Sequence, residues 1–191
     1  ALKIAGPASQ ARVRAYMDVD LSTDIRQIPE LVGPIIDGRA DVSFGSRLLP
    51  DSHVERCLKR EFISRCYNLM LQRYLHISFH DAQCGFKAIS ADAARTLLPQ
   101  VEDDEWFFDT ELLVLAERMG IASNEFAVNW REDPGTTVHI VDTVRKDLAG
   151  MKRLKRGGGA DRPHPRRTVI DDVRSERPYI RHDLKSAADA R

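Results

Sequence analysis

The amino-acid sequence predicts an α/β domain in which helices flank a mixed β-sheet. Short apolar stretches end in turn residues, as β-strands do, and longer stretches repeat apolar residues every three or four positions, as helices do. A chain of 191 residues is long enough for one domain with a hydrophobic core, which we place at residues 1–156. Residues 157–191 differ, with a glycine run, prolines and few apolar side chains, and we expect a disordered polar tail.

The first predicted strand, residues 13–17, runs directly into two carboxylates, Asp18 and Asp20. Ligands of α/β sheets bind outside the carboxyl ends of strands. Mg²⁺ prefers carboxylate oxygens, which it often shares with substrate phosphates. The pattern therefore predicts a metal–diphosphate site, although two acidic residues are also typical of a helix start that they merely stabilise.

A helix should follow over residues 24–36, with Ser22 or Thr23 as its N-cap and Gly38 as its end. Residues 41–45 then predict a second strand. It leads into a turn of small residues that presents the cation of Arg47 beside the end of the strand.

A long amphipathic helix is predicted from residue 54 to about residue 76. Its apolar positions at three- and four-residue spacings are Phe62, Ile63, Cys66, Leu69, Met70 and Tyr74. Its basic positions are Arg56, Lys59, Arg60, Arg65 and Arg73. Such a basic face is compatible with a solvated surface, with contact to anionic lipid headgroups, or with nucleic-acid binding.

The distribution of charge argues against nucleic acid as the partner. Lys152 to Arg191 holds 12 Lys and Arg against 6 Asp and Glu, a charge of +6, which leaves −6 for the rest of the neutral chain. A DNA or RNA binder needs a dominant positive field, which this body lacks. Three cysteines without paired spacing suit a reducing compartment.

Two further stretches contain candidate site residues. Asp81 and Lys87 flank the start of a predicted strand, residues 86–89, and are a candidate acid and phosphate-binding cation; a turn aspartate and an exposed strand lysine are the alternative. Asp109 and Glu111 stand near the start of a helix predicted over 106–117. There they favour the helix dipole, or Asp109 points into a pocket where burial raises its pKa.

The remaining pattern predicts a short helix from Ser90 that Pro99 limits, a strand over residues 126–130 and a last helix over residues 138–154. The last helix should place Val141, Val144, Leu148 and Met151 on one face.

Six motifs in one order resemble the polyprenyl- (dolichyl-) phosphate hexosyltransferases of glycosyltransferase family 2, in its glucosyl or mannosyl branch and closest to the glucosyl branch. They are DVDLST at 18–23, GSR at 45–47, KREFISR at 59–65, DAQCGFK at 81–87, WFFDTELL at 106–113 and WREDPGT at 130–136. The resemblance, over about residues 10–155, implies a partial GT-A (Rossmann-like) fold. It also implies inverting transfer of a hexose from a nucleotide diphosphate sugar to a polyprenyl phosphate, by a protein peripheral to the cytoplasmic face of a membrane.

The resemblance also implies roles for individual residues. Asp18 and Asp20 would hold Mg²⁺ or Mn²⁺ against the donor diphosphate, and Arg131 would reach the donor pyrophosphate. Asp81 lies in the motif of the acceptor and donor sugar and, with Asp20, is the candidate catalytic residue. The residues that match the lipid-phosphate contacts are Arg47, Arg60 and Ser64. Because a phosphate acceptor is already ionised, positioning and electrostatics would supply the rate without a strong general base.

Members of this family usually have about a hundred further residues before the Asp-x-Asp strand, which hold the base and ribose. We therefore expect residues 13–17 to form an edge strand, and the chain alone to be marginally stable, to self-associate and not to turn over a nucleotide sugar. Two other classes stay open: a glycosyltransferase with a non-lipid acceptor, and a non-catalytic remnant or subunit that binds a membrane or partner through the basic helix.

Overall fold

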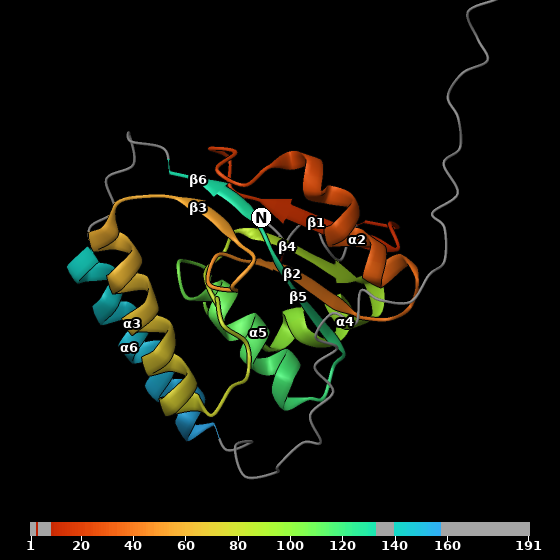
Figure 1. Ribbon diagram of the computed structural model, residues 1–191. Coiled ribbons are helices and arrows are strands. Elements are labelled where there is room, and N and C mark those ends of the chain that lie inside the picture. The colour runs from red at the N-terminus through yellow and green to blue at the C-terminus, as the bar shows by residue number, and fades with distance from the viewer. Residues whose placement is uncertain (1–2, 4–8, 133–139, 158–191) are drawn as a thin grey trace, which may run out of the picture.

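A computed structural model describes Lys3, residues 9–132 and residues 140–157, with the side chains of 140–145 left out (Figure 1). Within this part, four strands form a mixed sheet in the order β1-β4-β2-β5. The strands are β1 (Val13–Met17), β4 (Phe86–Ser90), β2 (Val42–Ser46) and β5 (Ser123–Ala127). β4 is antiparallel to both of its neighbours, and β2 and β5 are parallel. The prediction of an α/β fold with a mixed sheet is confirmed.

Helices cover both faces of this sheet (Figure 1). On one face lies α2 (Ile28–Ile36), which follows a 3₁₀ turn (Ile25–Gln27). The helices of the other side are α3 (Leu58–Leu75), α4 (Ala91–Leu97), α5 (Phe108–Arg118) and α6 (Ile140–Arg156), with a second 3₁₀ turn (Leu98–Gln100) after α4. Alternation along β4 divides the core, because Phe86 and Ala88 pack with α2 while Ile89 packs with α4 and α5.

The β1 strand lies at the edge of the sheet, as predicted. It pairs with β4 from Val13 opposite Ser90 to Met17 opposite Phe86, and no other described strand pairs with it. The free side of β1 therefore presents unpaired main-chain groups at this edge.

A second, two-stranded sheet corrects two predictions. β3 (His53–Glu55) pairs in parallel with β6 (Asn129–Arg131), so the long helix begins at Leu58 rather than at residue 54. The strand predicted over 126–130 is two strands, β5 and β6, with Val128 between them. The Val128 amide donates to the Ser46 carbonyl of the main sheet, and β6 pairs with β3 in the second sheet. The cap of the first helical segment is also neither Ser22 nor Thr23: Asp24 accepts the hydrogen bond from the Arg26 amide.

The predicted apolar face of the long helix is largely wrong, although Tyr74 packs against the core as predicted. Phe62 and Leu69 are 70% and 57% exposed, and α3 instead buries Asn68, Leu71 and Leu75. Asn68 can be buried because its amide group is satisfied: it donates to the Ser64 carbonyl at 3.0 Å and accepts from the Ala82 amide at 3.0 Å.

The last helix shows a similar difference. Met151 is buried, as predicted, whereas Leu148 is 41% exposed and the neighbouring carboxylate of Asp147 is buried in its place. The side chains of Val141 and Val144 lie outside the described residues, as does the predicted tail from residue 158 onward.

Candidate functional site

The Asp-x-Asp loop leaves β1 at its carboxyl end and is fixed by main-chain hydrogen bonds. The Asp18 amide donates to the Gly85 carbonyl at 2.8 Å, and Asp20 accepts from the Ser22 amide at 3.0 Å. Further along, the Arg131 amide donates to the Ser22 carbonyl at 2.8 Å. These bonds hold the loop between β4 and β6, so the two carboxylates start from a fixed backbone.

Gly85 makes room for the first of these carboxylates. A Cβ built on Gly85 would overlap the carboxylate group of Asp18, closer than atoms can approach. A side chain at residue 85 would therefore displace Asp18, so the absence of a side chain at this position is part of the site.

A buried polar cluster lies beside Asp18 and joins β1, β4 and α5. Lys87 is only 1% exposed, and its Nζ donates to Asp109 Oδ2 at 3.0 Å and to the Cys84 carbonyl. The Tyr16 hydroxyl donates to the other oxygen of Asp109 at 2.5 Å. The alternative of an exposed strand lysine is wrong, and Lys87 and Asp109 are brought together as a buried ion pair.

The charges around Asp18 fit a divalent cation. Loss of hydration, and then the carboxylates of Asp109 and Asp20, raise the pKa of Asp18, while Lys87 and Arg47 lower it by less. Excess negative charge of this kind is what Mg²⁺ or Mn²⁺ would offset, through the carboxylate oxygens it prefers. Within the described ranges no three acidic, histidine or cysteine side chains form a metal cluster, so a cation here would need further ligands from a bound phosphate.

Arg47 and Asp81 form a second buried ion pair. The Arg47 side chain donates through Nε to Asp81 Oδ2 at 2.7 Å and through Nη2 to Oδ1 at 2.9 Å, and its amide donates to Oδ2 at 3.0 Å. Burial alone would raise the pKa of Asp81, but the charge and hydrogen bonds of Arg47 outweigh it and lower that pKa to about 2. Asp81 is therefore an ionised group that orients Arg47.

Other predicted cations gather around Trp130 and the start of α3. The guanidinium of Arg47 lies 5.5 Å from the centre of the Trp130 ring, and that of Arg56 lies 5.8 Å from it. Arg60 pairs with Glu132, which also accepts from the Cys57 amide at 3.1 Å.

Two more of the predicted contacts are less enclosed. Ser64 lies one turn after Arg60 on α3 and is partly exposed. Arg131 is largely exposed beside Glu55, its Nε 3.3 Å from Oε2.

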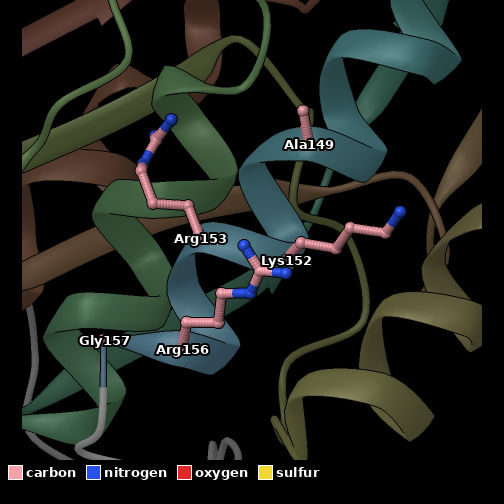
Figure 2. A pocket seen from close by; sticks show the side chains of 5 residues that line it. All are labelled: Ala149, Lys152, Arg153, Arg156 and Gly157. Carbon is pink, nitrogen blue, oxygen red and sulfur yellow. The ribbon is translucent and has the colours of Figure 1, made fainter.

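Glu111 is not brought to this cluster. Its Oε2 accepts from the Asp103 amide and from Arg153 Nη2, both at 2.8 Å. Figure 2 shows Arg153 extending from α6 toward α5, while Lys152 extends away from it. The carboxylate of Glu111 therefore ties α5 to α6, whereas Asp109, two residues earlier, faces β1 and β4.

Several residues of the site were not identified from the sequence. Tyr16 holds Asp109, Trp130 lies beside two arginines, and Glu125 accepts from the amides of His80 and Asp81. Only Tyr16 carried a signal, because it is an aromatic residue with a polar end on the strand that leads to Asp18.

An α/β sheet that presents Asp-x-Asp at the end of a strand, with space for the first carboxylate beside a glycine, fits the fold of the GT-A glycosyltransferases. Solved structures agree at the level of the fold. Glucosyl-3-phosphoglycerate synthase from Mycobacterium tuberculosis in complex with UDP matches with a TM-score of 0.55 at 18% identity, over 80% of this chain and 53% of that one. The same enzyme with Mn²⁺ and UDP-glucose matches with a TM-score of 0.54 at 15% identity, over 82% and 53%.

Sequence relatives are glycosyltransferases as well, which confirms the predicted resemblance. The chain is 41% identical over 151 residues to glycosyltransferase AglD of Haloferax volcanii. The matched region covers 79% of this chain and 24% of that protein. It is 29% identical over 134 residues to the dolichyl-phosphate β-glucosyltransferase of Dictyostelium discoideum, covering 67% and 41%. The chain thus spans about a quarter to two fifths of these relatives, and no family model matches it.

Proposed function

We propose that this chain provides the metal- and acceptor-side part of an inverting glycosyltransferase that transfers a hexose from a nucleotide diphosphate sugar to a polyprenyl phosphate. The observation that carries the proposal is the pair Asp18 and Asp20 at the end of β1, backed by the Lys87–Asp109 ion pair. The names of the sequence relatives, which include dolichyl-phosphate glucosyltransferases, support the lipid phosphate as acceptor.

Asp18 and Asp20 are the residues that would hold Mg²⁺ or Mn²⁺. Such a cation, when bound, stabilises the charge that develops on a leaving diphosphate. The protein's own part is to fix both carboxylates: Gly85 leaves space for Asp18, and the Ser22 amide orients Asp20. Asp109 adds negative charge nearby, and its pairing with Lys87 and Tyr16 keeps it in place.

Arg47, with Arg60 and Ser64, is proposed to contact the acceptor phosphate, and Arg131 the donor. Asp81 is fully buried and ionised, so its role would be to fix the guanidinium of Arg47 rather than to accept a proton. That role suits the reaction, because an acceptor phosphate is already ionised at neutral pH and needs a positioned cation more than a base.

We place the reaction at a membrane surface because of an exposed apolar stripe on α3. Leu58, Phe62, Cys66 and Leu69 recur at spacings of three and four, so they share one face, and Leu58 is 85% exposed. Exposed cations on the same helix are Lys59, Arg65 and Arg73. Apolar side chains bordered by cations match the acyl boundary and headgroups of an anionic bilayer.

A peripheral contact is the form of membrane association that we propose, at the cytoplasmic face. Among the described helices, none has the length and apolar character needed to cross a bilayer. Cys57 and Cys66 are exposed free thiols, which favours a reducing compartment.

The donor site is tested by metal binding with UDP as the probe. Mn²⁺ affinity, measured by electron paramagnetic resonance, should rise about tenfold when UDP is added. Asp20→Asn should remove that rise, and Asp37→Asn, which changes an exposed carboxylate at the end of α2, should retain it. An equal rise in Mn²⁺ affinity in the wild type and in Asp20→Asn would contradict the metal site and favour the alternative, in which the two carboxylates only stabilise a helix start.

The acceptor is tested by incubating UDP-glucose with and without a polyprenyl phosphate. Sugar transfer that depends on the polyprenyl phosphate supports the proposal. Turnover that is independent of it would indicate a non-lipid acceptor. Metal and UDP binding without turnover would fit a chain that needs further residues for the nucleotide.

The membrane contact is tested by sedimentation with vesicles. Binding to phosphatidylglycerol vesicles should exceed binding to phosphatidylcholine vesicles, and Phe62→Ser should weaken it about tenfold by removing one inserted aromatic side chain. Ile36→Ser changes a half-exposed apolar residue on α2 and is the matched control. Equal binding of both variants would show that α3 is not the membrane face.

A further inference from the structure

An unpaired arginine lies on β1, on the side of the sheet that faces α4. Arg14 is 9% exposed, and its Nη2 donates to the Ser9 carbonyl at 2.7 Å. Its Nε and Nη1 are buried and have no hydrogen-bond partner, and within the described ranges no carboxylate pairs with it. A buried guanidinium without an anion is energetically unfavourable, so this position indicates a missing negative partner.

A pocket beside Arg14 offers space for such an anion, and we call it the Arg14 pocket. It has a volume of about 670 Å³, and Lys3, Ser9 and Arg95 contribute polar side chains to it. Its apolar wall includes Leu98 and Pro99, from the 3₁₀ turn after α4. The charged residues that line it are all cations, and Arg14 is the one among them that has no carboxylate partner in the described part of the chain, so the pocket suits an anion at Arg14.

The two outer cations differ from Arg14 because they are already paired at the surface. Lys3 Nζ lies 2.6 Å from Asp104, and Arg95 pairs with Asp92, one turn earlier on α4. The Arg95 side chain is 68% exposed, and an exposed pair of this kind contributes little to stability; the Lys3 side chain is 25% exposed. Arg14 is therefore the fixed donor of the pocket, and Lys3 and Arg95 add charge around it.

A second basic pocket on α6 serves as a contrast. Lys152, Arg153 and Arg156 line it (Figure 2), but Arg153 is already bound to Glu111 and Glu102. Arg153 therefore has two carboxylate partners, whereas Arg14 has none among the described residues. It offers the matched position for a control substitution.

We propose that the Arg14 pocket binds a small phosphate monoester whose apolar part rests on Leu98 and Pro99. A phosphate has several acceptor oxygens for Nε and Nη1 of Arg14, and its negative charge would offset the charge of this buried guanidinium. Arg14 precedes Asp18 by four residues of extended chain, about 13 Å, so this site is separate from the proposed metal site. The proposal does not depend on the glycosyltransferase function.

The test is thermal unfolding of the whole chain in phenyl phosphate, in inorganic phosphate and in sodium chloride of equal ionic strength. EDTA is present so that metal at Asp18 and Asp20 does not hold phosphate. Near saturation, phenyl phosphate should raise the Tm by about 2–4 °C, and inorganic phosphate by less, because it lacks the apolar part. Arg14→Gln should remove the rise, and Lys152→Gln should retain it.

A second variant covers the case in which Arg14→Gln does not fold. Arg95→Gln changes an exposed residue at the rim and should weaken phenyl phosphate binding about threefold, measured by isothermal titration calorimetry. The proposal is overturned if the wild type shows no rise in Tm above that in chloride. It is also overturned if Lys152→Gln, rather than Arg14→Gln or Arg95→Gln, removes the effect.

Discussion

Asp18 and Gly85 share one small space at the end of the sheet. The Asp18 amide donates to the Gly85 carbonyl at 2.8 Å, and the Asp18 carboxylate lies where a side chain on residue 85 would begin. The main-chain bond fixes the backbone of Asp18 directly after β1, and the missing side chain leaves the space that its carboxylate occupies. Asp18 can therefore be disturbed from a neighbouring strand without being changed itself.

Gly85→Ala should displace the Asp18 carboxylate and so weaken UDP-dependent Mn²⁺ binding by at least tenfold. The physical reason is the overlap of the new Cβ with that carboxylate. Gly33→Ala is the control, because no atom lies within 4 Å of a Cβ there and alanine should stabilise α2 by about 1 kcal/mol. Unchanged metal binding in Gly85→Ala would show that Asp18 is not held in the way described.

Lys87→Met should lower the free energy of unfolding by about 3 kcal/mol, because it leaves the Asp109 carboxylate without its buried cation. The double variant Lys87→Met with Asp109→Leu should recover much of the loss, since no charge is then left unpaired. Urea unfolding of the four proteins in a double-mutant cycle measures the coupling. Additive effects of the two substitutions would contradict the ion pair.

The sequence predicted those parts of the fold that depend on local pattern. Strands β1, β2 and β4 follow from short apolar stretches that end in turn residues, and the end of the first helix follows from Gly38, which has a positive φ. The orientation of α3 could not be predicted in this way, because apolar residues occur around much of that helix. The buried position of Asn68 depends on an amide at Ala82, which lies in another segment.

The site was predicted as a set of residues and not as a set of pairs. Asp18 and Asp20 could be found because both follow one strand. The pairs Arg47–Asp81 and Lys87–Asp109 join segments 34 and 22 residues apart, and nothing in local spacing specifies them. Glu111 was grouped with Asp109 because they are close in sequence, yet two positions along a helix point to different sides.

Acid should destabilise the protein through Asp81. The pKa of Asp81 is lowered from 3.8 to about 2 in the folded state. The ionised carboxylate therefore adds to the free energy of unfolding above pH 4, and this stabilisation is lost as the pH falls toward 2. That contribution is about 2 kcal/mol. Asp81→Asn should therefore be less stable than the wild type at pH 6 and equal to it near pH 2, in urea unfolding at each pH. A difference that does not change with pH would contradict this assignment.

Asp147 should have the opposite dependence on pH. Its carboxylate is buried and accepts from Gln83 Nε2 at 3.2 Å, and its other oxygen has no hydrogen-bond partner among the described residues. Burial raises its pKa in spite of the hydrogen bonds from Tyr67 and Gln83. Protonated Asp147 therefore adds to the free energy of unfolding below pH 4, and this stabilisation is lost as the pH rises through the raised pKa. Asp147→Asn should be more stable than the wild type at pH 7, and this difference in the free energy of unfolding should decrease as the pH falls. Urea unfolding at each pH measures it.

The free side of β1 should cause self-association. β1 has β4 on one side and no described strand on the other, and Ala15, at its centre, is exposed. Unpaired main-chain groups at such an edge bind another strand, and a lysine on the edge opposes this because two copies would bring like charges together. Ala15→Lys should therefore shift the chain toward monomer, measured by size-exclusion chromatography with light scattering across a range of concentrations. Ala149→Lys adds the same charge at an exposed position on α6 and should leave the association unchanged. A wild type that is monomeric at every concentration, or two variants that dissociate equally, would show that β1 is not the associating edge.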